Sequence, residues 1–139
     1  MATVRDLLTR KGEAVVSIAP TDTVLRAAQL MNERTFGSLI VLDGDTVAGI
    51  VTERDILRRV VAAGLPPDRT PVREIMSTPV ITCVPETSLE ECAEIMTDRR
   101  IRHLPVSHGR GLDGMISIGD VLAFQVREQE DTIQYMKNY

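Results

Sequence analysis

The chain has 139 residues, a formal net charge of -4 at pH 7 and a sequence pI near 5.2. This length allows one compact domain or two small repeated halves and excludes a large multidomain enzyme. Only 3% of the residues are aromatic. Nucleic-acid binding is therefore not expected, because it depends on a basic surface or on aromatic side chains that stack with bases.

The N-terminal segment, residues 1–12, alternates charged and apolar groups and lacks the apolar core of a secretory signal. No stretch approaches the roughly 18 consecutive apolar residues of a transmembrane helix, so no membrane partner is expected. Cys83 and Cys92 form no C-x-x-C pair, which favours two buried thiols in a reducing compartment. The cytoplasm is the expected location, and an organellar matrix is the alternative.

An internal repeat organises the chain. Aligning Pro20 with Pro85, an offset of 65 residues, matches the two halves without a gap for about forty residues. The leaders that precede the copies, residues 4–8 and 72–76, match at an offset of 68, so the first copy carries three extra residues near 9–13. The predicted organisation is a first repeat at 1–65, a linker at 66–71, a second repeat at 72–127 and a C-terminal helical extension at 128–139.

Each copy predicts the same order of elements, β-α-β-β-α. A short apolar strand (14–18 or 80–84) ends at a proline and is followed by an N-cap signal and an amphipathic helix. Two strands and a final helix complete the copy; in the first copy the strands are 39–42 and 47–51. The fold class is α/β (α+β), with helices covering small apolar sheets. We expect the copies to pack sheet to sheet around a pseudo-twofold axis that leaves two related clefts.

The end of the third strand carries the same polar pair in both copies. A hydroxyl is followed three residues later by a carboxylate: Thr52 and Asp55 in the first copy, Ser117 and Asp120 in the second. One interpretation is a capping box, in which these side chains satisfy the first backbone groups of the next helix. The other is a ligand site, in which the carboxylate accepts both hydroxyls of a ribose and the helix start faces phosphate or sugar oxygens. The recurrence favours the ligand site.

At this point the sequence resembles a tandem pair of cystathionine-β-synthase (CBS) domains, also called a Bateman module. The resemblance covers roughly residues 3–127 and rests on the leaders VRDLL and VREIM, the segment GIVTERD and the strand RHLPV. No catalytic domain is attached to this sequence, so it looks like a stand-alone CBS pair. The resemblance implies a sensor for AMP, ADP, ATP, NAD or S-adenosylmethionine, bound as regulatory ligands and not as catalytic cofactors.

The resemblance also implies the residues of a first cleft, which come from both copies: Thr52, Asp55, Val80, Ile81, Arg102, His103 and Pro105. In this interpretation Thr52 and Asp55 hold the ribose, and Val80 and Ile81 line the adenine slot. The basic pair then lies near the phosphates, where an arginine beside a histidine suits an anion. The alternative is a solvated strand end paired with a neighbouring acid.

A second cleft follows by the repeat: Ala14, Val15, Gly37, Ser38, Ser117 and Asp120. Ser117 and Asp120 would hold the ribose, with Ala14 and Val15 beside the base. Gly37 and Ser38 replace the basic pair of the first cleft, so we expect weaker binding of a charged ligand there.

No enzyme is expected, because the sequence holds neither G-x-S-x-G nor H-E-x-x-H and its two histidines lack metal-ligand spacing. The final segment, 121–139, predicts one long helix with apolar residues near one face: Leu122, Val126, Ile133 and Met136. We expect this face to contact a second copy in a homodimer; a frayed tail is the alternative. The sensor would signal to a separate effector protein of unknown identity. A ligand-free dimerisation scaffold and a nucleotide-acting enzyme are the competing functions.

Overall fold

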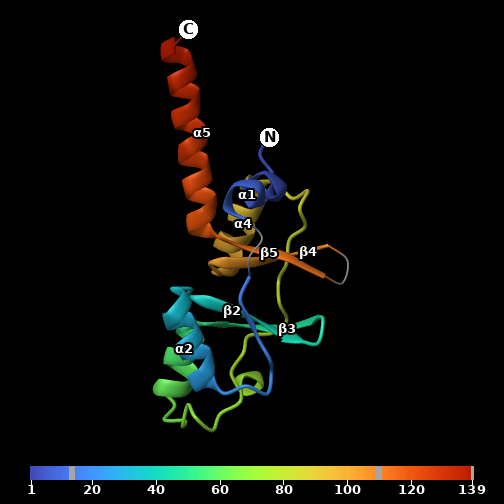
Figure 1. Ribbon diagram of the computed structural model, residues 1–139, viewed down its shortest axis with the longest axis vertical. Helices are drawn as coiled ribbons and strands as arrows, with labels where there is room; N and C mark the ends of the chain where they lie inside the picture. Colours follow the sequence, from blue (N-terminus) through green and yellow to red (C-terminus); the bar gives the residue numbers. More distant parts are fainter. Residues whose placement is uncertain (13–14, 109–110, 139) are drawn as a thin grey trace. The chain divides into compact units, whose positions relative to one another are not determined.

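The computed structural model describes residues 1–12, 15–108 and 111–138 (Figure 1). In chain order the elements are α1 (Val4–Lys11), β1 (Ser17–Ile18), α2 (Val24–Arg34), β2 (Ser38–Asp43), β3 (Thr46–Thr52), α3 (Glu53–Ile56), the π-helical η1 (Leu57–Val61), the 3-10 helix η2 (Val72–Glu74), α4 (Leu89–Arg99), β4 (His103–His108), β5 (Gly111–Ser117) and α5 (Ile118–Asn138). The predicted α+β class is confirmed.

The chain divides into two compact units, and each is described by itself. The N-repeat unit contains residues 15–81 with 111–112, and the C-repeat unit contains residues 1–12, 82–108 and 113–138. The units therefore differ from a simple cut of the sequence into halves. The N-terminal helix α1 belongs with the second copy, and η2 belongs with the first.

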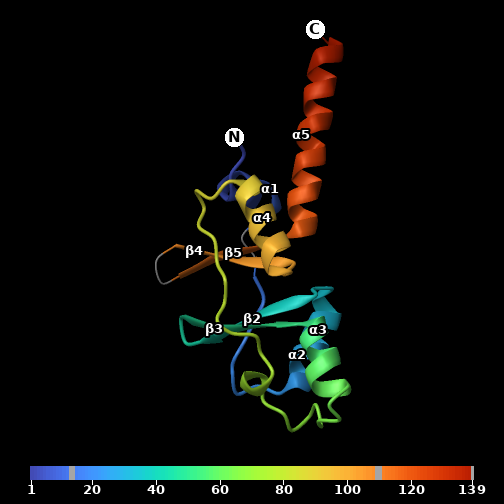
Figure 2. The ribbon, with the colours of Figure 1, turned by 180° about the vertical axis from the view of Figure 1, so that it is seen from behind.

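In the N-repeat unit, β1 pairs in parallel with β2, and β2 pairs with β3 in antiparallel register from Ser38 opposite Thr52 to Asp43 opposite Thr46. The two-residue turn between them contains Gly44 at φ +63°, a conformation that glycine adopts without strain. The helices α2 and α3 lie side by side against this sheet (Figure 2). The core of the unit consists mainly of aliphatic side chains from these layers, among them Val24, Ala27, Met31, Leu39, Val41 and Val51.

The C-repeat unit repeats this pattern with α4, β4, β5 and α5. Ser88 caps α4 by accepting the Glu91 N–H at 3.1 Å, as Thr23 caps α2 by accepting the Arg26 N–H. The first part of α5 packs against α1 and α4, and Val121 and Phe124 are buried there. Beyond that contact α5 continues past the other helices of its unit (Figure 1).

The predicted first strands are shorter than expected. The prediction of a strand over 80–84 is wrong: Cys83 alone makes a β-bridge, to Val106, donating to the Pro105 carbonyl and accepting from the Ser107 N–H. Pro79 and Pro85 flank this segment, and proline has no N–H to extend a strand ladder. In the first copy the strand is limited to Ser17–Ile18, and Ala14 lies outside the described residues.

Each leader packs against the other copy: the first leader contacts the second copy, and the second leader contacts the first copy. The Val4 N–H donates to the Thr87 carbonyl and the Arg5 N–H to the Pro85 carbonyl, both at 2.9 Å. At the equivalent positions the Val72 N–H donates to the Asp22 carbonyl (2.7 Å), and the Arg73 N–H donates to the Pro20 carbonyl (3.0 Å). The change of offset between leaders and repeats, from 68 to 65, thus separates two pieces of chain that belong to different units.

No helix among the described residues is long and apolar enough to span a bilayer.

Candidate functional site

The carboxylate of Asp55 lies where β3 ends and α3 begins, and it is almost completely buried. Its Oδ2 accepts the Thr52 N–H at 3.0 Å, while the Asp55 N–H donates to Thr52 Oγ1 at 3.1 Å. These two bonds form a complete capping box. The capping-box geometry expected from the sequence is therefore present, whether or not a ligand also uses the carboxylate.

Ser77 makes the second contact to Asp55. Its Oγ donates to Asp55 Oδ1 at 3.0 Å. Ser77 is held beside β3 because its backbone exchanges two hydrogen bonds with Ile50, of 2.8 and 3.2 Å. Ser77, which directly follows the leader of the second copy, thus supplies a neutral hydroxyl to the carboxylate of the first copy.

Arg59 brings positive charge to the same group without a direct hydrogen bond to it. Its Nη1 donates to the carbonyls of Ile75 and Met76, at 3.0 and 3.2 Å, and its Nε lies 3.9 Å from Asp55 Oδ1. The guanidinium therefore connects η1 to the leader and leaves both carboxylate oxygens with neutral donors.

The equivalent carboxylate in the second copy, Asp120, has the same capping box and a charged neighbour. Its Oδ2 accepts the Ser117 N–H at 2.9 Å, and the Asp120 N–H donates to Ser117 Oγ at 3.0 Å. The ammonium of Lys11, at the end of α1, donates to the same Oδ2 at 2.5 Å and to the Met115 carbonyl at 2.7 Å. The side chain of Asp120 is 27% exposed and that of Asp55 is 10% exposed.

The pKa of Asp120 is shifted below its usual value. Burial, the largest single influence, favours the neutral acid and raises the pKa. The hydrogen bond from Lys11, the N–H of Ser117 and the charge of Lys11 act in the opposite direction and together outweigh it. Asp120 is therefore held as a carboxylate paired with a lysine.

In each unit, the residue before a strand is hydrogen-bonded to the first residue of the helix that carries the carboxylate. This residue precedes β2 in the N-repeat unit and β4 in the C-repeat unit. The Gly37 carbonyl accepts the Glu53 N–H at 3.1 Å, and the Arg102 carbonyl accepts the Ile118 N–H at 2.9 Å. Within a unit, the structure thus brings Gly37 next to the Thr52 capping box and Arg102 next to the Ser117 capping box.

With this geometry established, two segments of the chain, residues 4–62 and 72–127, match the CBS domain family. The chain belongs to the CBS-domain family. The capping-box residues lie near the end of each matched domain, Thr52 and Asp55 in the first and Ser117 and Asp120 in the second. Each CBS domain therefore supplies one such group.

Relatives cover nearly the whole CBS pair. The chain is 36% identical over 146 residues to the CBS domain-containing protein CBSX3, mitochondrial, of Arabidopsis thaliana, which covers 99% of this chain and 71% of that protein. A solved CBS-domain structure from Burkholderia ambifaria superposes with a TM-score of 0.88 at 41% identity, covering 92% of this chain and 96% of that one. A hexameric CBS-CP12 protein from bloom-forming cyanobacteria gives a TM-score of 0.77 at 36% identity, covering 88% and 70%.

The other residues predicted for the ligand clefts of the CBS pair lie in both units. Arg102 is exposed, His103 is half-buried and Pro105 is buried, all in the C-repeat unit. The remaining predicted residues belong to the N-repeat unit: Val15, Val80 and Ile81, which are half-buried, and Ser38, which is buried. The grouping of residues from both CBS domains into each cleft stays a prediction.

Sequence reasoning missed three side chains around the carboxylates: Lys11, Arg59 and Ser77. Ser77 aligns with Thr9 at the leader offset of 68, immediately after the matched leader residues. Lys11 lies in the three-residue insertion near 9–13, and no motif in the sequence points to a role for that insertion. The insertion extends the first leader, where α1 has 8 residues and η2 has 3.

Both cysteines are free and buried, as expected. The hydrogen bond to Cys92 and burial raise the pKa of Cys83, so this thiol stays protonated. Among the described residues, no three His, Cys, Asp or Glu side chains are grouped closely enough to hold a metal ion.

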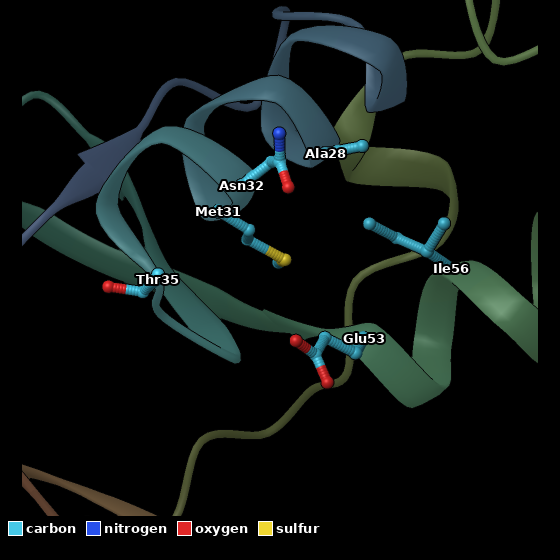
Figure 3. A pocket seen from close by; sticks show the side chains of 6 residues that line it. All are labelled: Ala28, Met31, Asn32, Thr35, Glu53 and Ile56. Carbon is cyan, nitrogen blue, oxygen red and sulfur yellow. The ribbon is translucent and has the colours of Figure 1, made fainter.

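A surface pocket of about 470 Å³ lies between α2 and α3 of the first CBS domain (Figure 3). Its lining combines apolar and polar side chains: Ala28, Met31, Asn32, Thr35, Glu53 and Ile56. None of these residues belongs to the predicted ligand clefts. One lining residue, Glu53, lies between Thr52 and Asp55 in the sequence, at the start of α3.

Proposed function

We propose that this CBS pair is a regulatory sensor that binds an adenosine-containing nucleotide, with the Asp55 carboxylate accepting the ribose hydroxyls. The observation that carries the proposal is the arrangement of donors around Asp55. A carboxylate offers about four lone-pair positions, two on each oxygen. Thr52 uses one position on Oδ2 and Ser77 uses one on Oδ1.

One acceptor position then remains on each oxygen beside these contacts. The two adjacent hydroxyls of a ribose each carry one O–H donor, so a carboxylate with an acceptor position on both oxygens matches them. The capping box and the Ser77 bond also fix the carboxylate before any ligand arrives, which reduces the entropic cost of binding. AMP, ADP, ATP, NAD and S-adenosylmethionine all present such a diol.

In this proposal Arg102 and His103 supply positive charge for the phosphates, and Val80 and Ile81 contact the base. A ligand that contacts residues of both CBS domains stabilises those conformations in which both domains reach it. Its occupancy thereby changes the surface that a separate effector protein binds. The cytoplasm is the proposed compartment, and the mitochondrial relative supports an organellar matrix as the alternative.

One observation favours the competing function of a ligand-free scaffold. Both capping boxes are complete in the protein itself, so Asp55 and Asp120 have a structural role without any ligand. If that were their whole role, removing either carboxylate would change helix stability and no binding property.

The deciding experiment is isothermal titration calorimetry with AMP, ADP, ATP, NAD and S-adenosylmethionine on wild type and Asp55→Asn. Asparagine keeps one oxygen acceptor for the capping box. Its amide nitrogen is a donor, so the side chain cannot accept from the two diol hydroxyls with two separate oxygens. A thermal-shift assay gives a parallel readout, because ligand at a hundred times its Kd adds about 2.7 kcal/mol to stability. We expect binding of at least one nucleotide to wild type and its loss in Asp55→Asn.

The matched control is 2′-deoxy-AMP, which lacks one of the two hydroxyls and is expected to bind more weakly than AMP to wild type. Equal affinity for the two would contradict the role of Asp55 as the diol acceptor. No heat and no thermal shift with any of the five ligands would favour the scaffold.

We also propose that the chain forms a homodimer through the exposed face of α5. Four apolar side chains on that helix are each more than half exposed: Leu122, Val126, Ile133 and Met136. With Gln129 they follow the alternating spacing of four and three residues that is typical of helix–helix seams. The hexameric assembly of the CBS-CP12 relative is consistent with self-association in this family.

Sedimentation or light scattering tests this dimer. We expect Ile133→Asp to reduce the mass from dimer to monomer, because it would place a charge in the apolar seam. The control is Glu130→Gln on the same helix, which lies outside the seam. A monomeric wild type would contradict the dimer.

A further inference from the structure

We infer that Lys11 blocks the diol-binding position of the second CBS domain, so that wild-type protein binds a nucleoside at Asp55 and not at Asp120. This inference rests on the proposed function. Asp55 and Asp120 occupy equivalent positions in the two repeats and share the same capping box. The difference between them lies in the side chain that the leader delivers.

Hydrogen-bond capacity distinguishes the two carboxylates. At Asp120, both the Ser117 N–H and the Lys11 ammonium donate to Oδ2, at 2.9 and 2.5 Å. Two donors use both lone-pair positions of that oxygen. A diol that must donate to each carboxylate oxygen therefore finds Oδ2 occupied, whereas at Asp55 the two donors are divided between Oδ1 and Oδ2.

Charge makes the occupation of Asp120 harder to displace than a neutral hydroxyl would be. Hydrogen bonds between ionised partners are shorter and stronger than neutral ones. Lys11 is also held from a second direction, because its ammonium donates to the Met115 carbonyl at 2.7 Å. A ribose that displaced Lys11 would break both bonds, while a ribose at Asp55 needs to displace neither Thr52 nor Ser77.

Lys11 is placed there by the leader exchange and by the insertion. The helix α1 packs on the C-repeat unit through Val4, Leu7 and Leu8, which are all buried, and Arg10 adds an ion pair to Glu128 of α5. Lys11 follows on the last turn of α1. The three extra residues that follow the first leader thus include Lys11, the side chain that makes diol binding at Asp120 differ from diol binding at Asp55.

The test is titration calorimetry with adenosine on wild type, Lys11→Met and the double variant Lys11→Met/Asp120→Asn. Adenosine carries the diol but no phosphate, so loss of a positive charge does not by itself weaken its binding. Methionine keeps the length of the lysine side chain without its donors. Lys137→Met is the matched control, since Lys137 is the other lysine of the chain and lies on the last turn of α5.

We expect wild type and Lys137→Met to bind one adenosine per chain. Lys11→Met should bind two, with affinity at Asp120 at least about ten-fold tighter than in wild type, because in wild type a ribose has to break the Lys11 bonds to both Asp120 and the Met115 carbonyl. The second equivalent should disappear in Lys11→Met/Asp120→Asn. No gain of an adenosine equivalent from wild type to Lys11→Met, or weaker binding than in wild type, would overturn the inference.

Asp55→Asn separates this inference from the proposed function. If wild type binds one adenosine and Asp55→Asn binds none, the proposed function stands whatever Lys11→Met does. If wild type binds none and Lys11→Met binds one that Asp120→Asn removes, the block of Asp120 by Lys11 stands while the assignment of binding to Asp55 fails. If neither wild type nor Lys11→Met binds adenosine, both fail. Binding to wild type that only Asp120→Asn abolishes would also overturn both.

Discussion

Asp55 and Asp120 occupy equivalent positions of the two CBS domains, yet the leader residues that reach them differ in charge. Ser77 donates a neutral hydroxyl to Asp55, and Lys11 donates an ammonium to Asp120. The capping boxes are the same in both, so the two copies share the helix start and differ in the surroundings of the carboxylate. A duplicated motif therefore does not guarantee two equal sites; the segment packed beside each copy decides what the motif can bind.

The largest expected effect comes from detaching the first leader. Leu8 is buried, and a Cβ built on Gly114 would lie 2.9 Å from its Cδ2, so the two residues are in close contact. We expect Leu8→Ala to lower the free energy of unfolding by about 2–5 kcal/mol, through lost burial and the cavity that remains. Urea denaturation measures this change.

Met76→Ala is the control at the equivalent leader position, where Met76 contacts Gly49 and is only half-buried. We expect a smaller loss there. If Met76→Ala were the more destabilising of the two, the second leader and not the first would be the more firmly packed.

The next largest loss of unfolding free energy is expected when either carboxylate is removed. Asp55→Ala leaves the Thr52 N–H and the Ser77 hydroxyl without their acceptor in a buried site, which costs about 1–3 kcal/mol. Asp120→Ala should cost less, about 0.5–2 kcal/mol, because Lys11 is partly exposed and its ammonium can turn to water. Thermal or urea unfolding of both variants checks the order, and a larger loss for Asp120→Ala would reverse the comparison.

A smaller effect separates the two carboxylates by their response to salt. A double-mutant cycle with Lys11→Met and Asp120→Asn should give a coupling of about 0.2–1 kcal/mol that decreases as salt is added. The corresponding cycle with Ser77→Ala and Asp55→Asn should give a coupling that salt leaves nearly unchanged, because Ser77 carries no charge. Equal salt dependence of the two cycles would contradict the distinction.

The smallest expected effect is a pH dependence of the Lys11 contribution. The pKa of Asp120 is lower in the folded protein than in the unfolded chain, so the unfolded state binds its proton first as pH falls. The stabilisation is complete above the ordinary aspartate pKa of about 3.9 and is lost as pH falls through the lower folded value. The stability difference between wild type and Lys11→Met should shrink in that range. A constant difference from pH 7 to pH 2 would show that Lys11 acts through packing alone.

Much of the fold could be predicted because it depends on local patterns. The N-caps Thr23 and Ser88, the amphipathic helices after them and the hydroxyl–carboxylate pairs all lie within a few residues of the groups they contact. The apolar character of the segment 80–84 predicts a strand, but strand formation also needs a ladder of paired backbone groups. Cys83 finds one such partner in Val106 and the flanking prolines provide no N–H.

The sequence alone determined the duplication, the family resemblance and the capping boxes, because each is a short-range pattern that occurs twice. Only the tertiary structure decided which leader lies beside which carboxylate. Lys11 and Asp120 are separated by 109 positions, and Ser77 and Asp55 by 22. Such contacts depend on how buried faces of α1 and η2 pack against their units, and periodicity within one segment does not specify its partner. The charge that distinguishes the two sites therefore follows from packing and not from the motif.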